Sequence, residues 1–429
     1  METHSNDKKS GDRLPATPRL LWFILAAALV LSFGYAATFR PAAPEYLVSD
    51  SAEYHSLAVS ILTEHSFQKS VFRAPGYPAF LAVVYLFAGT ASLWPVYFAQ
   101  SLVLALTLFL VYKIALRITR DERTSVLAVA LCAIWPPIWL GAGDVLTETL
   151  SGALVAGSLW LLLKAMDRPG ALLCVGLGLV MGAMALTKGS FLLFIAAALL
   201  FVIFSGKDRL RRVGSALIVF CAAAALIVPW IVRDYKLTGA FVPIQTGGGM
   251  NLWLGNWPDY WRTQHEWGTY PKPVARLIRG KPEVERERIL AGLGWNYIRQ
   301  NPLRASGIFL RKFSFLWLGA LGADPRGAGN PIPHIGSFGI TKRSIAYVPL
   351  FVAALLGWLW LAPEARKRAW PMMALLVLWS VPYVLTMAVA RYTVPVVYYE
   401  MLLAAVAVRR IGAQRRCLPT DSKLYRPSG

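Results

Sequence analysis

Long apolar runs recur along this chain from Leu20 to Val408. Most of them approach the ~20 residues that an α-helix needs to cross the hydrocarbon core of a bilayer. The 429 residues are 56% hydrophobic, which is more apolar side chain than a water-soluble fold of this length would hold. The alternation of apolar and polar residues that marks a membrane β-barrel is missing from the runs. The sequence therefore predicts an all-α, polytopic membrane protein.

The runs define about ten expected spans, within a range of nine to twelve. The basic residues before the first run could be read as the start of a signal peptide. The full length of that run and the many spans after it favour a retained first helix instead. The expected spans are residues 20–39, 96–116, 124–140, 146–163, 171–187, 190–205, 213–231, 345–361, 370–389 and 393–408.

Short basic clusters between the spans set the expected topology, because short loops rich in Lys and Arg stay in the cytoplasm. All the clusters fall inside only if residues 77–89, which are short for a span, lie along the outer surface. Residues 40–95 would then form one exterior loop, in which residues 52–62 have apolar side chains at helical spacing. Both termini would be cytoplasmic. The clusters lie in residues 113–123, 164–168, 207–212, 366–368 and 409–416.

The topology predicts five parts along the chain. They are a cytoplasmic tail 1–19, a catalytic transmembrane module 20–231 that includes the exterior loop 40–95, a long basic exterior loop 232–344, C-terminal transmembrane helices 345–408 and a cytoplasmic tail 409–429.

The long exterior loop carries an excess of positive charge. Residues 233–343 hold sixteen Lys and Arg against seven Asp and Glu. A loop of this length is outside the reach of the positive-inside rule. Its charge suits a phosphorylated lipid or another anionic partner, or simple adhesion to anionic headgroups. Because Arg311 and Lys312 interrupt residues 305–319, we interpret that stretch as an interfacial helix, with a span as the alternative. The net charge of +21 follows largely from topology, so nucleic acid is not an expected partner.

The expected topology brings two carboxylates and four cations to the exterior face. A carboxylate at that face can take a proton from an attacking hydroxyl group. Arginine can bind phosphate oxygens with two parallel hydrogen bonds. Together they fit a reaction on an anionic substrate carried by a lipid. The six residues are Asp50, Asp144, Arg73, Lys188, Arg233 and Arg391.

Each of these residues also has a purely structural interpretation. Asp50 could cap the helix that begins near Ala52. Asp144 and Glu148 could interact favourably with the dipole at the N-terminus of a helix, and we favour this interpretation for Glu148. Lys188 could extend along the membrane interface, and the two later arginines could anchor helix ends. The four cysteines and five histidines show neither disulfide nor metal-ligand spacing.

Five stretches, taken in order, resemble the GT-C fold glycosyltransferases of the bacterial dolichyl-phosphate-mannose protein mannosyltransferase and aminoarabinose transferase type. Each is weak alone, and the set spans residues 20–408. They are residues 50–54 (DSAEY) with 73–78 (RAPGYP), 144–148 (DVLTE), 186–189 (LTKG), 229–235 (PWIVRDY) running on through 246–258 (TGGGMNLWLGNWP), and 391–395 (RYTVP).

This resemblance implies an activity and a site. Such enzymes take a sugar from a polyprenyl-phosphate carrier at the outer face of the bacterial inner membrane and pass it, with inversion, to a hydroxyl group. Asp50 would be the catalytic base, and Asp144 would position the acceptor or a divalent cation. Arg73 would face the carrier phosphate, supported by other cations. The residues expected to bind substrate are Arg73, Glu53, Tyr54, Lys188, Arg233, Asn251, Asn256, Arg391 and Tyr392.

The partners implied are the polyprenyl-phosphate sugar donor, a glycolipid, polysaccharide or protein acceptor, and membrane lipids. Asp234 departs from the asparagine expected after the Pro-Trp-x-x-Arg pattern. The oligosaccharyltransferase signature and a large exterior domain after the last span are both missing, which argues against transfer of whole oligosaccharides to asparagine. A transporter or flippase of a lipid-linked sugar is the alternative, and a non-catalytic assembly factor is a third. A transporter should carry polar features near the bilayer midplane, whereas these span interiors are nearly free of charge.

Overall fold

The computed structural model describes residues 18–257, 270–319 and 342–416. Within these ranges the chain forms helices and no strand, so the all-α prediction is confirmed. A helix coincides with each expected span. These helices are α1 (Arg19–Phe39), α4 (Leu93–Thr119), α5 (Glu122–Ile134), α7 (Thr147–Asp167), α8 (Ala171–Thr187), α9 (Leu192–Phe204), α10 (Arg209–Thr238), α16 (Lys342–Trp360), α17 (Pro363–Leu385) and α18 (Val397–Arg416).

Fewer helices have the length of a membrane span than the apolar pattern predicts. In the described ranges six helices are long and apolar enough to cross a membrane, namely α1, α4, α7, α10, α16 and α17. Three apolar helical segments are shorter, residues 76–88, 171–187 and 189–204. One expected span, 124–140, is divided: α5 ends at Ile134, and α6 (Pro136–Gly141) follows. Pro136 and Pro137 supply no backbone N–H, which explains the break.

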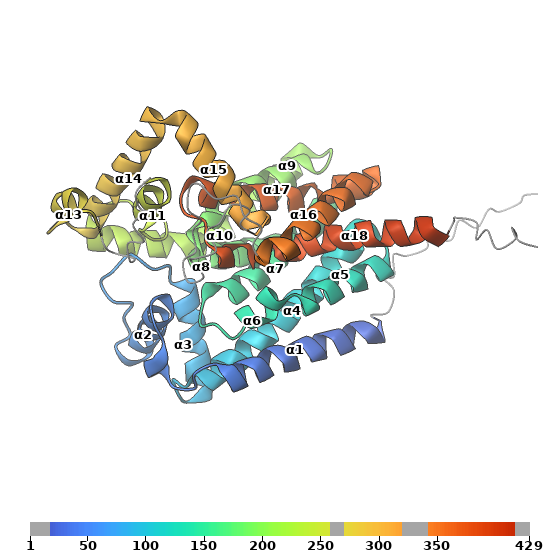
Figure 1. The fold of residues 1–429 in the computed structure, drawn as a ribbon, viewed down its shortest axis with the longest axis horizontal. Coiled ribbons are helices and arrows are strands. Elements are labelled where there is room, and N and C mark those ends of the chain that lie inside the picture. The colour runs from blue at the N-terminus through green and yellow to red at the C-terminus, as the bar shows by residue number, and fades with distance from the viewer. Residues whose placement is uncertain (1–17, 258–269, 320–341, 417–429) are drawn as a thin grey trace, which may run out of the picture.

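The connections between the long helices alternate between two ends of the bundle (Figure 1). At the end where α1 begins and α18 ends, basic residues hold neighbouring helix termini together. Arg212 donates to the carbonyl of Ala165 at 3.0 Å, and Arg368 donates to that of Ile118 at 2.9 Å. The basic clusters expected on one side of the membrane therefore share one end of the bundle. That this end faces the cytoplasm stays a prediction.

Two helices of the first loop, α2 (Asp50–Thr63) and α3 (Gly76–Ala88), lie at the opposite end (Figure 1). A side chain at Gly76 would come within 2.8 Å of the backbone nitrogen of Thr187, so α3 starts against the end of α8. The helix finishes just before Leu93, where α4 begins. Both ends of α3 thus lie at one end of the bundle. That residues 77–89 do not cross the membrane stays a prediction.

The long basic loop folds into further helices at this same end, namely α11 (Gly248–Asn256), α13 (Lys272–Ile278), α14 (Glu283–Gln300) and α15 (Pro302–Trp317). A side chain at Gly255 would overlap the backbone of Thr386, so α11 rests directly on the end of α17. Lys312 of α15 donates to the carbonyl of Thr386 at 2.6 Å and to Asn256 at 3.2 Å. The lysine thereby satisfies carbonyls that the end of α17 leaves open.

Close packing of α8 against α10 supports this end of the bundle. A side chain at Gly178 of α8 would lie 2.6 Å from the Cβ of Ala222 of α10, and Gly182 is similarly close to Ala223. Small residues at such positions let helix backbones approach closely in membranes. The packing fixes where α8 ends, and therefore where the turn after it presents its side chains.

Candidate active site

Asp50 lies between two arginines from distant parts of the chain. Its Oδ1 accepts a hydrogen bond from Arg73 Nη2 at 2.6 Å, and its Oδ2 accepts one from Arg391 Nη2. Asp50 is the first residue of α2, and the N-cap residue is Ser49, whose side chain makes no capping hydrogen bond. The carboxylate is therefore engaged by two guanidinium groups, and the capping interpretation does not describe it.

The backbone just before Asp50 is strained. Ser49 has φ 52°, a left-handed value that is uncommon outside glycine. Such conformations tend to occur at functional sites, where the surrounding structure holds them in place. Here the strained residue immediately precedes the carboxylate that bridges the two arginines.

Arg73 is positioned by the first turn of α2. Its Nε donates to Glu53 at 2.5 Å, and its guanidinium lies 5.2 Å from the centre of the Tyr54 ring. A cation over an aromatic face is favourable, more so where water is excluded. The next residue, Ala74, donates its N–H to the side chain of Gln245 at 3.0 Å, which ties the loop to the segment before α11.

Glu148, Lys188 and Arg391 form the second half of the cluster. Glu148 stands in the first turn of α7 and is only 4% exposed. Its carboxylate accepts a hydrogen bond from Lys188 Nζ at 3.2 Å and lies 3.6 Å from Arg391 Nε. Lys188 is 4.6 Å from the centre of the Tyr392 ring, so its side chain points into the protein and does not extend along the interface. Buried charges of this kind require such partners.

The electrostatics of the site differ from one carboxylate to the next. Burial alone would raise the pKa of Asp50, but Arg73 and Arg391 more than offset it, and the pKa lies below its usual range. Burial raises the pKa of Asp144 in spite of Arg40, which is 2.5 Å away. Asp50 is therefore the carboxylate that stays ionised to lower pH.

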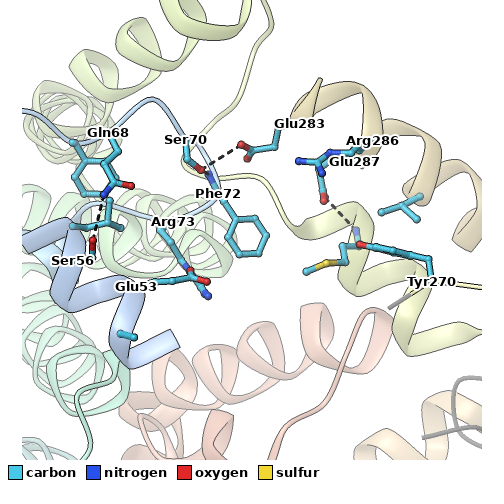
Figure 2. Close-up of a pocket in the computed structure, with 15 residues that line it drawn as sticks. Glu53, Ser56, Gln68, Ser70, Phe72, Arg73, Tyr270, Glu283, Arg286 and Glu287 are labelled. Carbon is cyan, nitrogen blue, oxygen red and sulfur yellow. Dashed lines mark hydrogen bonds and ion pairs between the residues drawn. The ribbon is translucent and has the colours of Figure 1, made fainter. Parts of the chain in front are cut away.

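Two cavities flank the cluster. The first has a volume of about 630 Å³ and lies between α2, the loop that leads to Arg73, Met250 of α11, Tyr270 and α14 (Figure 2). The second has a volume of about 290 Å³, and its lining includes Arg40, Asp144, Glu148 and Arg391. Arg73 lines the first cavity and Arg391 lines the second. Asp50 lines neither cavity, but it binds one arginine from the lining of each.

Three residues expected to bind substrate make no bond to Asp50 in the described structure. Arg233 donates to the carbonyls of Phe67 and Gln68 at 2.7 and 2.6 Å, so it holds the loop that leads to Arg73. Asn256 belongs to the junction of α11, α15 and α17 described above. Asn251 lies on α11. In the described part of the chain no hydrogen bond or ion pair joins these three side chains to Asp50.

Two members of the cluster were not among the expected site residues. Its sequence position favours a helix-dipole role for Glu148. The same position, four residues after Asp144, also indicates a second acid at the same helix end. Arg40 directly follows the first span and pairs with Asp144. Its position at a membrane boundary was the available signal.

Within the described ranges no group of three His, Cys, Asp or Glu side chains could hold a metal ion. Asp144, the residue expected to position a divalent cation, is instead paired with Arg40.

Comparison with known proteins bears on the fold. Residues 72–232 match the family model described as dolichyl-phosphate-mannose-protein mannosyltransferase. No protein of curated function matches the sequence significantly. The apo oligosaccharyltransferase of Archaeoglobus fulgidus has a similar structure, with a TM-score of 0.56 and 16% identity over 92% of this chain and 51% of that one.

Two further solved structures are similar. Oligosaccharyltransferase AglB from Archaeoglobus fulgidus, in complex with an inhibitory peptide and a dolichol-phosphate, aligns with a TM-score of 0.50 and 16% identity over 95% of this chain and 53% of that one. ArnT from Cupriavidus metallidurans bound to undecaprenyl phosphate aligns with a TM-score of 0.43 and 15% identity over 93% and 80% of the two chains. This chain spans about half the length of the archaeal enzyme. The expected resemblance to GT-C membrane glycosyltransferases is confirmed at the level of the fold.

Proposed function

We propose that this multi-pass membrane protein is a glycosyltransferase that moves a sugar from a polyprenyl-phosphate carrier to a hydroxyl acceptor, with inversion at the anomeric carbon. The observation that carries the proposal is the carboxylate of Asp50, bound by Arg73, which lines one cavity, and by Arg391, which lines another. The family model, named for an enzyme that uses dolichyl-phosphate-mannose, supports this donor class, as does the similar AglB structure with its dolichol-phosphate.

The proposed reaction is one displacement at the anomeric carbon. The acceptor oxygen forms a bond to that carbon, the bond from the carbon to the phosphate oxygen breaks, and the acceptor proton passes to Asp50. The phosphate leaves with the electron pair of the broken bond, and fixed cations stabilise its charge. A single displacement inverts the configuration of the carbon. No step requires a metal ion.

The second cavity is suited to the phosphate. Arg40, Arg343 and Arg391 line it, against the two acids Asp144 and Glu148. In the described structure Arg40 Nε is buried without a hydrogen-bond acceptor, and Arg391 Nε is buried 3.6 Å from the Glu148 carboxylate, beyond hydrogen-bond distance. Buried N–H groups without acceptors are costly, and phosphate oxygens would supply acceptors for both.

Binding of the phosphate would also activate the base. In the free protein Arg73 and Arg391 stabilise the ionised form of Asp50 and weaken it as a proton acceptor. A phosphate that takes hydrogen bonds from Arg391 would remove part of this stabilisation, and the pKa of Asp50 would rise. The carboxylate would therefore become a stronger base once the donor is present.

The position of the cluster favours an enzyme over a transporter. Glu148, Lys188 and Arg391 lie at the starts, ends and turns of helices and not at their midpoints. A transporter of a lipid-linked sugar would place its binding groups near the bilayer midplane. We further propose that this end of the bundle faces the exterior of the bacterial inner membrane, with Asp144 and Tyr392 beside the substrates there.

Mass analysis of surface glycans tests the proposed function. Glycans from cells that make the protein should carry one sugar unit that is missing from cells without it. The unit should return with the wild-type chain and with an Asp167→Asn variant, which changes an exposed acid at the opposite end of the bundle. Identical glycan masses with and without the protein would contradict the proposal.

A further inference from the structure

We infer that the 630 Å³ cavity between α2 and α14 is the acceptor subsite and that it binds a saccharide portion of the acceptor. The inference rests on the proposed function and selects among the acceptor classes that the sequence left open. It begins from the place of the cavity. Its walls come from α2, the loop that leads to Arg73, Met250 of α11, Tyr270 and α14, all outside the long helices, at the end of the bundle opposite the start of α1 and the end of α18.

The cavity shares Arg73 with the catalytic cluster. Figure 2 shows Glu53 and Arg73 on one side of the cavity and Arg286, Glu287 and Tyr270 on the other. Arg73 both lines the cavity and binds Asp50 at 2.6 Å. A hydroxyl group of a ligand in this cavity would therefore approach Asp50 from the Arg73 side. The phosphate of the donor would approach from the Arg391 side.

These opposite approaches fit the proposed stereochemistry. Inversion requires the attacking oxygen and the leaving phosphate to lie on opposite faces of the anomeric carbon. Arg73 lines one cavity and Arg391 lines the other, and both arginines bind Asp50, so the two cavities provide such an arrangement. A single shared cavity would not separate the two reactants in this way.

The chemistry of the lining fits a sugar ring. Hydroxyl groups are recognised by fixed hydrogen-bonding side chains, and the C–H face of a sugar ring packs on an aromatic ring. Glu283 is held by Ser70 at 3.3 Å and by Thr246, and the cavity also presents the rings of Phe72 and Tyr270. Side chains that are already held in place lose less conformational freedom when a ligand binds.

The second carboxylate of this wall is fixed in the same manner. Glu287 accepts hydrogen bonds from the backbone N–H groups of Gly249 and Met250 at 2.8 and 3.2 Å. Arg286, on the next position of α14, makes no ion pair in the described part of the chain and lines the cavity. It is the cation available to hydrogen-bond a ligand without first leaving a partner.

Other ligand classes fit this cavity less well. Three acids, Glu53, Glu283 and Glu287, face two arginines, so a phosphate would be repelled more than in the second cavity. The charged side chains also make the cavity unsuitable for a hydrocarbon chain, because burying them against apolar groups without hydrogen bonds is costly. A hydroxyl-rich, uncharged ring satisfies both carboxylates and arginines.

The test compares two arginines of one helix. Arg286 lines the cavity and Arg288, two residues on, does not. The probe is the oligosaccharide fraction released by mild acid from the cells' own surface glycans, added to the purified full-length protein. Binding is measured by saturation-transfer NMR, with tryptic envelope peptides as the second probe and undecaprenyl phosphate as the probe for the donor side.

Arg286→Ala should weaken oligosaccharide binding about tenfold and leave undecaprenyl phosphate binding unchanged, whereas Arg288→Ala should change neither. Tyr270→Ala should repeat the effect of Arg286→Ala through loss of the ring. Binding of peptides alone, or equal loss with both arginine variants, would overturn the inference. The readout does not depend on sugar transfer. Saccharide binding without transfer would therefore count against the proposed function alone, and transfer without Arg286-dependent saccharide binding against the subsite alone.

Discussion

Glu148 offers a sharp test of the buried part of the site. Its carboxylate is the acid that contacts Lys188, and it also lies 3.6 Å from Arg391. A Glu148→Gln substitution keeps the shape of the side chain and removes its charge. Lys188, whose side chain is only 14% exposed, would then hold a cation beside a neutral group. Burial lowers the pKa of Lys188, and the negative charge of Glu148 opposes that effect. Loss of this charge should therefore lower the free energy of unfolding.

The expected magnitude follows from this burial. Removing one partner of a buried ion pair costs about 3–5 kcal/mol, and the partial exposure of Lys188 and the remaining amide favour a value of about 3 kcal/mol. Unfolding entropy of about 2 cal/mol/K per residue makes 1 kcal/mol equivalent to about 1 °C in Tm for a chain of this length. The Tm of Glu148→Gln should therefore fall by about 3 °C. A double variant that also carries Lys188→Met should recover about 2 °C, because no buried cation is left without its partner.

Thermal unfolding of the purified protein in detergent, followed by tryptophan fluorescence, measures both values. Glu364→Gln is the matched control, since it breaks an ion pair with Lys367 in which both side chains are 74% exposed. Exposed pairs contribute little, and the control should leave Tm unchanged. The reasoning is refuted if Glu148→Gln behaves like the control, or if the double variant loses as much as the two single variants together.

Three further predictions concern pH and topology. Burial lowers the pKa of Lys312 to about 7, so between pH 7 and about 10 the unfolded chain binds more protons than the folded chain and the unfolding free energy should rise with pH. Urea unfolding at several pH values should show this rise, at most about 1.4 kcal/mol per pH unit, and Lys312→Met should abolish it. Burial would raise the pKa of Asp50, but Arg73 and Arg391 hold it lower, so the acidic limb of kcat/KM should lie at lower pH than an ordinary aspartate would give. The acidic limb of kcat should lie at higher pH than that of kcat/KM, and coincident limbs would contradict activation by the donor. In a chain without its native cysteines, an exterior thiol reagent should label Asp144→Cys but not Arg120→Cys, and the reverse pattern would overturn the topology.

The helices of the bundle could be predicted, because the length of each apolar run can be read directly from the sequence and compared with the length of a membrane span. Each expected span coincides with a helix, and the basic clusters that set the expected topology share one end of the bundle. Pro136 stands in the sequence where α5 and α6 separate, but apolar length alone predicts one span over residues 124–140. Within residues 232–344 the helix expected near residues 305–319 is present as α15, whereas α11, α13 and α14 were harder to foresee, because the stretch as a whole was expected as a loop.

The site was predictable only in part, for a physical reason. Asp50, Arg73, Lys188 and Arg391 could be assigned to one end of the bundle from topology alone. Which side chains touch there depends on helix rotation and on loop paths, which periodicity does not set. Arg233 shows the difference, since it shares that end of the bundle and yet binds the backbone of the loop before Arg73.

The central claim is that Asp50 is the base in sugar transfer from a polyprenyl phosphate. The most direct measurement is the rate of transfer from a labelled polyprenyl-phosphate sugar to envelope glycans by the purified protein and by its Asp50→Asn variant, with Asp167→Asn as control. A general base contributes about 10²–10⁴ in rate. Asp50→Asn should lose that factor while its expression and membrane insertion stay intact, and the control should transfer normally. Undiminished transfer by Asp50→Asn would contradict the account.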